Sequence, residues 1–495
     1  MKLALTIAVS ILIVPFAARP EDAAPRIHRI EAAAVDMPLA ENEPATRLSL
    51  EQLMTLYKVP ALSIAVIDHF EIVWAKAYGT VELGSPAPVT TSTLFQAGSI
   101  SKPVAATGAL YLVEHGKLSL DEDVNQKLKT WKVPENEFTK TQKVTLRRLM
   151  SHTAGLTVHG FPGYAVGDRV PTLVEIFNGE KPANTAPIRV DLSPGTKVRY
   201  SGGGVTIEQQ LMMDVAGKPF PALMREIVLD KIGMTDSSYE QPLPSALAAR
   251  TATGTYGDGK MVRGRWHVYP EMAAAGLWTT PTDLCKFAIE IALSRHGKSN
   301  RVLSEAQTRE MLTPVMDDAG LGFFMEKGNP GQFGHNGADE GFQALLTMNS
   351  ETGKGVAIMA NSDNGIAAAD FVLRAVAKEY AWNYKFEPHE FGTMLLALKL
   401  KGAQAALQSH KGKLDEGMMN GLGYSLLFSG QTQDAIAVFQ RNVQDYPKSA
   451  NVYDSLGEAY MKAGRKDLAI QNYEMALKLN PESKTAAEML KKLRQ

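Results

Sequence analysis

The chain has 495 residues, a length that predicts two or more domains. Hydrophobic residues make up 45% of it and charged residues 21%, which is typical of a globular protein and excludes a disordered or fibrous one. The formal net charge of −1 provides no broad basic field, so binding to nucleic acid or acidic lipid is not expected. Cys285 is the single cysteine, which excludes an intrachain disulfide and a cysteine-cluster metal site.

The first segment, residues 1–18, predicts a secretory signal peptide. Lys2 gives it a positive start, residues 3–16 are mainly apolar, and Ala17 and Ala18 provide small residues before the end. The apolar run is shorter than the roughly 20 residues that span a bilayer. We therefore expect an exported protein, periplasmic or secreted, with no stable membrane span in the mature chain. A polar linker is expected over residues 19–43.

The second segment, residues 44–386, mixes strand and helix patterns. A short amphipathic helix is predicted near residues 48–58, and alternating apolar residues over 61–79 predict a β-hairpin. Helical patterns with many glycines and prolines follow over 120–320, and strand patterns return over 321–364 before a helix over 367–382. Strands at both ends with helices between them predict an α+β domain whose sheet is assembled from both ends of the segment.

The last segment, residues 387–495, predicts an all-α region of tetratricopeptide repeats. Small residues where two helices cross, and a proline that ends each unit, recur with a spacing of 34 residues, which is the period of this repeat. Such repeats bind proteins or brace a neighbouring domain, so a protein partner is expected here as one alternative. The first set comprises Gly423, Gly430, Ala435, Ile436, Phe439 and Pro447, and the second Gly457, Gly464, Ala469, Ile470, Tyr473 and Pro481.

The stretch Ser99-Ile100-Ser101-Lys102 predicts a nucleophilic site. Pro103 is tolerated in the first turn of a helix, so the helix should begin at or near Ser99. Lys102 then lies on the same face as Ser99, where its amine can activate the weakly nucleophilic hydroxyl. The Ser99 backbone N–H can also hold the oxyanion of a tetrahedral intermediate. Taken alone, the pair could equally be a helix cap and a solvated lysine.

Five motifs in order make the catalytic interpretation stronger, because the chain over about residues 45–385 resembles the penicillin-recognising serine hydrolases. This family includes class C β-lactamases, D-alanyl-D-alanine carboxypeptidases, D-aminopeptidases and related esterases. The resemblance implies an antiparallel sheet flanked by helices, a helical subdomain, and an active site between them. The motifs are FQAGSISK (95–102), RRLMSHTAGL (147–156), KVRYSGGG (197–204), AAAGLWTTPTDLCKF (273–287) and GHNGADEGF (334–342).

By this resemblance Ser99 is the nucleophile, Lys102 its partner, and Tyr200 a second base or a relay of the proton to the leaving group. The Ala338 N–H would be the second oxyanion donor beside that of Ser99. The remaining positions implied to contact substrate are His335, Asn336 and Gly337 on a strand, and Ser201 and Gly202 after the tyrosine. The reaction would be acyl transfer through an acyl-enzyme on a small-molecule or peptide substrate, for which neither a metal nor an organic cofactor is needed.

Two positions depart from the β-lactamase pattern. Gly202 stands where a Tyr-x-Asn motif has its asparagine, and His335 stands where class C enzymes have a lysine. A histidine is largely neutral above a pKa of about 6.5, so recognition of a substrate carboxylate is weakened. We therefore expect a peptidase-like or esterase-like hydrolase, with a cell-envelope peptide of D-amino acids among its substrates. The alternatives are a β-lactamase, and a non-catalytic scaffold or sensor that binds a partner through its repeats.

Overall fold

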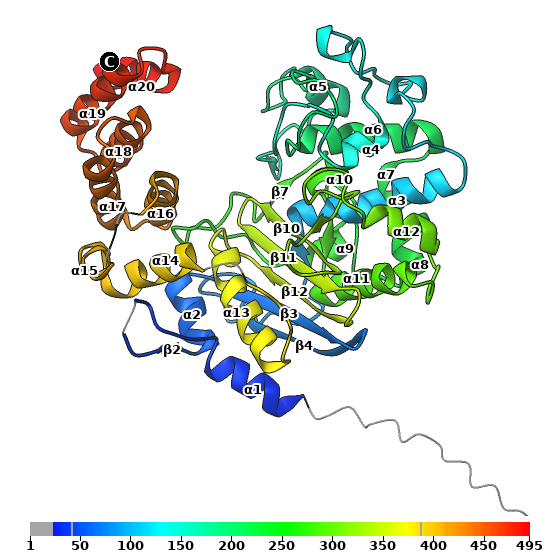
Figure 1. Ribbon diagram of the computed structural model, residues 1–495, viewed down its shortest axis with the longest axis horizontal. Helices are drawn as coiled ribbons and strands as arrows, with labels where there is room; N and C mark the ends of the chain where they lie inside the picture. Colours follow the sequence, from blue (N-terminus) through cyan, green and yellow to red (C-terminus); the bar gives the residue numbers. More distant parts are fainter. Residues whose placement is uncertain (1–22, 41–42, 387–388, 411, 413) are drawn as a thin grey trace, which may run out of the picture.

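The computed structural model describes residues 23–40, 43–386, 389–410, 412 and 414–495. Figure 1 shows a central sheet, a group of helices at the upper right, and a column of C-terminal helices that rises on the left. This arrangement is the α+β fold predicted from the sequence, followed by an all-α region. The predicted signal peptide lies outside the described residues.

The central sheet has six strands in the order β4-β3-β12-β11-β10-β9, and every neighbouring pair is antiparallel. The order confirms that strands from both ends of residues 44–386 share one sheet, because β3 pairs with β12. The edge strand β9 pairs with β10 only at Phe333 and Gly334, which leaves residues 335–339 of β10 without a strand on that side. The strands are β3 Ala61–Asp68, β4 Glu71–Gly79, β9 Phe324–Met325, β10 Gln332–Asp339, β11 Phe342–Asn349 and β12 Lys354–Ala360.

Helices cover both faces of the sheet, so its central strands are apolar on both sides. In β3, Ala61 and Ala65 point into one core, whereas Leu62, Ile64 and Val66 point into the other. Helix α11 (Pro281–Arg295) packs on the first face, and α2 (Leu50–Tyr57) and α13 (Gly365–Glu379) pack on the second. The buried thiol of Cys285 is part of the packing of α11, and burial raises its pKa, as expected for a structural cysteine.

The helical group at the upper right of Figure 1 extends the first core away from the sheet. Its helix α3 (Ser101–Glu114) follows a single 3₁₀ turn, η1 (Gly98–Ile100), and packs against α6 (Gly202–Ala216) and α10 (Met272–Ala275). Helices α4 (Leu146–Met150), α5 (Leu173–Asn178) and α7 (Phe220–Met224) also belong to this group. Three further helices lie lower, beside the sheet: α8 Asp230–Ile232, α9 Ser245–Ala248 and α12 Glu305–Met311.

The C-terminal helices form antiparallel pairs with the geometry expected of the repeats. Gly423 faces the ring of Phe439, and Gly457 faces that of Tyr473, so the small residues permit the close helix crossing. Their core is continuous with the core between α13 and the sheet, which joins the repeats to the rest of the chain. The helices are α14 Glu390–Lys401, α15 Ala403–Ser409, α16 Glu416–Phe428, α17 Thr432–Asp445, α18 Ala450–Lys462, α19 Lys466–Leu479 and α20 Lys484–Arg494.

The segment predicted as a linker, residues 19–43, carries regular structure in its described part. Helix α1 (Ala24–Ala32) packs against α13, where Ile30 is buried and Arg29 pairs with Glu379 at 2.6 Å. Strand β1 (Val35–Met37) then pairs with β2 (Thr46–Leu48). The prediction of a linker was wrong here because the apolar side chains that anchor α1 are sparse and their partner helix is more than 300 residues away in the sequence.

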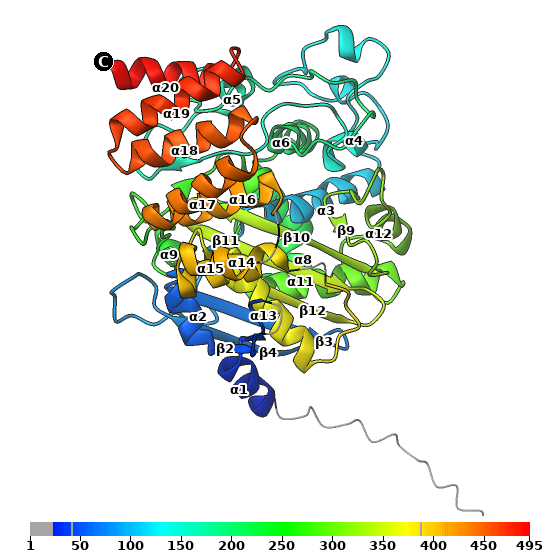
Figure 2. The same cartoon turned by 60° about the vertical axis from the view of Figure 1, so that its left-hand side comes forward.

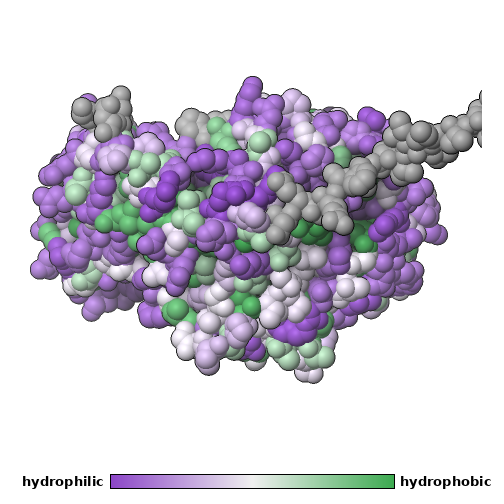
Figure 3. Space-filling model, turned by 90° about the horizontal axis from the view of Figure 1, so that it is seen from below, coloured by the Kyte–Doolittle hydropathy of each residue, from purple (hydrophilic) through white to green (hydrophobic). Residues whose placement is uncertain are grey.

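The face seen in Figure 3 is mainly hydrophilic, with hydrophobic residues in small groups between charged ones. Such a surface is usual for a protein in contact with water. Among the helices that the structure describes, none is both long and apolar enough to cross a bilayer.

Candidate active site

Ser99 and Lys102 meet at the start of α3. Ser99 lies in the 3₁₀ turn η1, and Lys102 lies in the first turn of α3, one helical turn further on. The Lys102 Nζ donates to Ser99 Oγ at 2.8 Å and to the carbonyl oxygen of Ala274 at 2.7 Å. Lys102 is 3% exposed, so its amine is held against the hydroxyl and away from bulk water. The solvated lysine that the sequence left as an alternative is therefore wrong.

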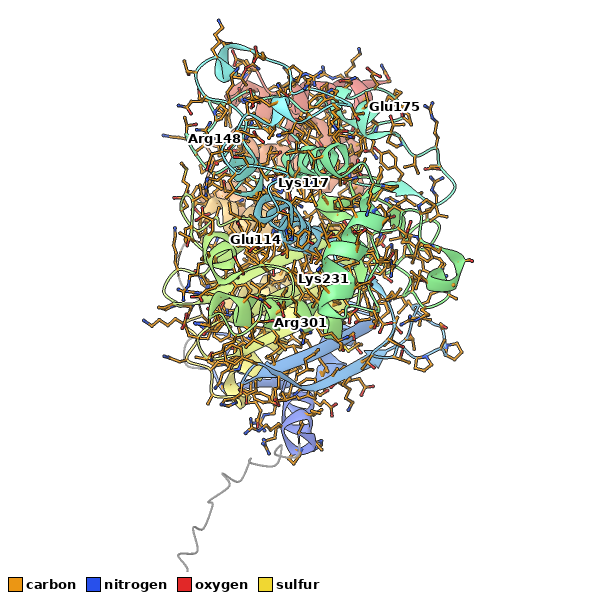
Figure 4. All side chains as sticks on the ribbon, turned by 90° about the vertical axis from the view of Figure 1, so that its right-hand side faces the viewer. Glu114, Lys117, Arg148, Glu175, Lys231 and Arg301 are labelled. Carbon is orange, nitrogen blue, oxygen red and sulfur yellow. The ribbon has the colours of Figure 1, made fainter. Side chains whose placement is uncertain are left out.

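Helix α3 begins at this buried pair and ends at the surface of the protein. Nearly all of its residues up to Leu112 are buried, whereas Glu114 at its last turn is exposed. Figure 4 shows Glu114 and Lys117 at the outer end of α3, among other charged side chains on the face opposite the repeats. The reacting end of the helix is thus the buried end, where a lysine is normally not tolerated unless it is paired.

The backbone of β10 lies directly against the turn that carries Ser99. A Cβ on Gly337 would lie 1.9 Å from the Ala97 carbonyl oxygen and 3.1 Å from Ser99 N, and a Cβ on Gly98 would lie 2.4 Å from Ala338 N. Both positions therefore require glycine. This contact brings the backbone nitrogens of Ser99 and Ala338 to the same place, which is the arrangement expected for two oxyanion donors.

Tyr200 lies beside this pair, directly before α6. The Lys102 Nζ is 5.0 Å from the centre of its ring, and its hydroxyl has no hydrogen-bond partner among the described residues. The rings of His152, His159 and Phe324 surround it, with centroids 4.3, 4.8 and 6.3 Å away. Packing thus fixes the ring, and the hydroxyl is left for a ligand.

The glycines after Tyr200 lie at the start of a helix, although glycine disfavours helices. Gly202 and Gly203 are buried in the first turn of α6, where added Cβ atoms would lie 3.1 Å from the His159 carbonyl oxygen and 2.9 Å from that of Thr157. Glycine is needed because the loop of residues 157–161 packs directly on the helix backbone. The run could not be assigned to a helix from propensity, since glycine disfavours helix interiors.

Ser201 and Gly202, which the resemblance places in substrate binding, have structural roles. The Ser201 hydroxyl donates to the Thr157 carbonyl oxygen at 2.7 Å and accepts from Gly204 N–H at 3.0 Å, which caps α6. The Ser201 N–H donates to His152 Nδ1 at 3.2 Å. Neither Ser201 nor Gly202 lines the cleft, so the proposed site does not include them.

His335 lies on β10, lines the cleft and is 8% exposed. Burial and the neighbouring charge of Lys102 lower its pKa from 6.5 to about 3, so its ring is neutral near neutral pH. Its Nδ1 is 2.5 Å from the carbonyl oxygen of Asn336, and a proton on Nδ1 would leave Nε2 as an acceptor with no partner among the residues that the structure describes. His335 therefore supplies no positive charge for a substrate carboxylate.

Two buried carboxyl groups, Glu208 and Asp339, lie near Lys102, and a third, Glu271, lies near Asp339. Burial raises the pKa of Glu208 and of Glu271 to about 8 and that of Asp339 well above its usual value, while Lys102 lowers the pKa of Glu208 and Asp339 in part. The sequence analysis assigned no role to them, although Asp339 lies within the motif GHNGADEGF (334–342), because the burial of an acid is not visible in the sequence. The charge of the site therefore depends on whether Glu208, Glu271 and Asp339 are protonated.

The turn of Ser99, the ring of Tyr200 and strand β10 lie around a cleft of about 680 Å³. Ser99, Tyr200, His335, Asn336 and Ala338 all line it, so the structure brings together the nucleophile and the strand residues predicted from the motifs. His159 and Phe324 also line it and were missed by the sequence analysis, since a lone histidine and a phenylalanine carry no specific motif. Further lining residues come from α13 and the segment after it, namely Asp370, Leu373, Arg374, Tyr384 and Phe386.

The chain is similar in sequence to a beta-lactamase and to a penicillin-binding protein, and in fold to a penicillin-binding protein homologue. A beta-lactamase from Pseudomonas fluorescens is 30% identical over 242 residues, which cover 48% of this chain and 62% of that protein. Penicillin-binding protein 4 of Amycolatopsis lactamdurans is 27% identical over 345 residues, 65% of this chain and 85% of that protein. The solved structure of the octameric penicillin-binding protein homologue from Pyrococcus abyssi matches in fold, with a TM-score of 0.56, 22% identity, and coverage of 70% of this chain and 80% of that one.

Models of two protein families match separate parts of the chain. A tetratricopeptide repeat model matches residues 450–483 and a second one matches residues 421–449. The model described as Beta-lactamase matches residues 48–381, more than half of the chain. The chain therefore belongs to the Beta-lactamase family and carries tetratricopeptide repeats after the matched region.

Proposed function

We propose that this protein is a serine hydrolase that cleaves an amide or ester through an acyl-enzyme on Ser99. The observation that carries the proposal is the 2.8 Å contact between the buried Lys102 amine and Ser99 Oγ, next to the two backbone nitrogens at the contact of β10 with η1. Each role of nucleophilic catalysis then has a candidate: nucleophile, base, oxyanion donors and proton relay. We also propose that residues 44–386 form the hydrolase domain and residues 387–495 the repeat region of an exported protein.

In the proposed reaction Lys102 first gives up the proton that makes it a cation in the resting site, and its free amine then accepts the proton of Ser99 as Oγ attacks the carbonyl carbon. The oxyanion that forms is held by the N–H groups of Ser99 and Ala338. Tyr200 lies across the cleft from β10 and passes a proton to the leaving nitrogen or oxygen as the bond to it breaks. Water then attacks the acyl-enzyme, the same groups act in reverse, and Ser99 recovers its proton.

The neutral His335 favours a peptidase-like or esterase-like reaction over a β-lactamase. A substrate carboxylate at this part of the cleft would meet a buried imidazole without charge. Arg374, the cation farther along the cleft, already pairs with Asp370 at 2.9 Å and lies over the ring of Phe386. Substrates without a carboxylate beside the scissile bond should therefore react faster than those with one.

The test is covalent labelling of the purified protein with a fluorophosphonate and with a fluorescent penicillin. We expect the fluorophosphonate to label Ser99, located by mass spectrometry, with no label in Ser99→Ala and much slower labelling in Lys102→Met. Ser101→Ala is not a suitable control, because Ser101 Oγ binds the Gly98 carbonyl oxygen at 2.6 Å. Ser92→Ala, at an exposed serine of a surface turn, should label like the wild type. Rapid release of a penicillin label would instead indicate a β-lactamase.

The second candidate is a non-catalytic scaffold in which the repeats bind a partner protein. The observation in its favour is the pair of well-formed repeats, each with buried helix crossings. If neither reagent modifies Ser99 in the folded protein, the scaffold replaces the hydrolase as the proposed function. The arrangement of Lys102 and Ser99 argues against it, since the buried Lys102 amine lies within hydrogen-bond distance of the Ser99 hydroxyl, as a base for this nucleophile must.

A further inference from the structure

A second cavity, of about 600 Å³, adjoins the cleft and is closed by helices outside the matched Beta-lactamase region. Ala338 and Gln343 line both cavities, so the second continues the first along β10 and β11. Its opposite wall is formed by Phe391 of α14 and by Tyr424 and Phe428 of α16. Figure 2 shows these two helices over the part of the sheet that contains β10 and β11.

This wall is held in place by hydrogen bonds at the end of α16. The Ser429 hydroxyl lies 3.1 Å from Asn364 Oδ1, and Lys58 Nζ donates to the Ser429 carbonyl oxygen at 2.9 Å. A Cβ on Gly257 would lie 2.9 Å from the Phe428 carbonyl oxygen, so the two backbones are in close contact. The helix is therefore positioned against the hydrolase part as closely as elements within one domain.

The position of the second cavity relative to Ser99 indicates which part of a substrate it would hold. The leaving group must lie near Tyr200, which lines the first cavity together with His159 and Phe324. The second cavity lies beyond Ala338 and is lined by neither Ser99 nor Tyr200. A carbonyl carbon at Ser99 with its oxygen at the Ala338 N–H thus directs the acyl substituent into the second cavity.

The chemistry of the walls indicates what that substituent is. Phe428 is 55% exposed and Phe391 is 39% exposed, and both rings line the same cavity together with Tyr424, which makes this wall a contiguous aromatic surface. Among the ionisable groups that line the cavity, Asp363 Oδ1 accepts from Gly341 N–H at 2.7 Å and Lys399 donates to Gln431 at 2.8 Å. Burial raises the pKa of Asp339 well above its usual value, which favours its uncharged form. The hydroxyl of Tyr57, which is 1% exposed and lines the cavity, has no partner among the residues described.

We propose that α14 and α16 complete the acyl-group subsite of Ser99, and that this subsite takes a bulky, uncharged aromatic acyl group. The inference rests on the proposed function, because it requires an acyl-enzyme on Ser99. The carboxylate of Glu340 at the Ala338 end of the cavity disfavours an acyl group that carries a negative charge there. The repeat region would then contribute directly to substrate choice, through the first helices that follow the hydrolase part.

The test uses two esters with the same leaving group, p-nitrophenyl acetate and p-nitrophenyl 4-phenylbutyrate. Phe428→Ala removes an exposed ring, so we expect a folded protein whose kcat/KM for the phenylbutyrate falls by about 10-fold while that for the acetate stays within about twofold. Phe391→Ala should behave in the same way and serves as a second variant. Leu479→Ala, also 39% exposed but on α19 away from the cavity, is the matched control and should change neither rate.

Every outcome of this test either supports or overturns the proposed acyl-group subsite. Equal effects of Phe428→Ala and Phe391→Ala on both esters, or no effect on either, would overturn the subsite while leaving the hydrolase intact. The same conclusion follows if the wild type prefers the acetate over the phenylbutyrate. Failure of the proposed function has a separate signature, since Ser99 would then resist the fluorophosphonate and neither ester would be cleaved, and the subsite would fall with it.

Discussion

The contact between β10 and the Ser99 turn gives the most direct test of the site geometry. Gly337→Ala would place a Cβ 1.9 Å from the Ala97 carbonyl oxygen, whereas a carbon–oxygen contact is normally about 3.3 Å. The strand and the turn must therefore separate by about 1.4 Å, the difference between these distances. A displacement of about 1 Å at a reacting centre costs about 100-fold in rate. We expect kcat/KM for an activated ester to fall by at least about 100-fold, which corresponds to about 2.7 kcal/mol.

The assay combines ester hydrolysis, the rate of fluorophosphonate labelling and thermal unfolding of the same samples. Gly160→Ala is the matched control, because a Cβ at that exposed glycine near the cleft meets no atom within 4 Å. It should change the rate by no more than about twofold. A folded Gly337→Ala protein that labels and turns over like the wild type would refute the assignment of this backbone contact to oxyanion binding.

Three further predictions concern stability. The pKa of His335 is about 3 in the folded protein and 6.5 ordinarily, so only the unfolded chain binds a proton between these values. The free energy of unfolding should therefore decrease as the pH falls below 6.5, by about 1.4 kcal/mol per pH unit for this group. In His335→Gln, the free energy of unfolding measured by urea denaturation should depend less steeply on pH. Glu208 has a pKa of about 8 when folded and 4.5 ordinarily, so its contribution to stability is complete below pH 4.5 and is lost as the pH rises to 8. Glu208→Gln should accordingly gain in melting temperature relative to the wild type at pH 8 and not at pH 4.5, and an equal change at both would contradict the assignment. Gly423→Ala would place a Cβ 2.4 Å from the ring of Phe439 and should destabilise the repeats by about 1–3 kcal/mol in denaturant unfolding, whereas Gly464→Asn at an open helix end should cost less than about 1 kcal/mol.

The resemblance to the family and the local pattern together predicted the fold class and the repeats. The alternation of apolar residues over 61–79 predicted the hairpin of β3 and β4, and the 34-residue spacing predicted the helix pairs of the repeats. These signals are local, since each depends on a period of side-chain positions within one element or one repeat. Helix α1 was missed because its partner α13 is remote in sequence.

For the site, the spacing of Ser99 and Lys102 within one helical turn was sufficient to predict their contact, because a helix places residues three apart on one face. The sequence places glycine at positions 98 and 337, but only the tertiary structure explains why a side chain is excluded there. The atoms that a Cβ would contact at each position belong to another element. The same holds for the charge state of His335, which depends on burial and on Lys102, and for the cavity closed by α14 and α16. Both arise from contacts between segments far apart in the chain, and no local pattern encodes such contacts.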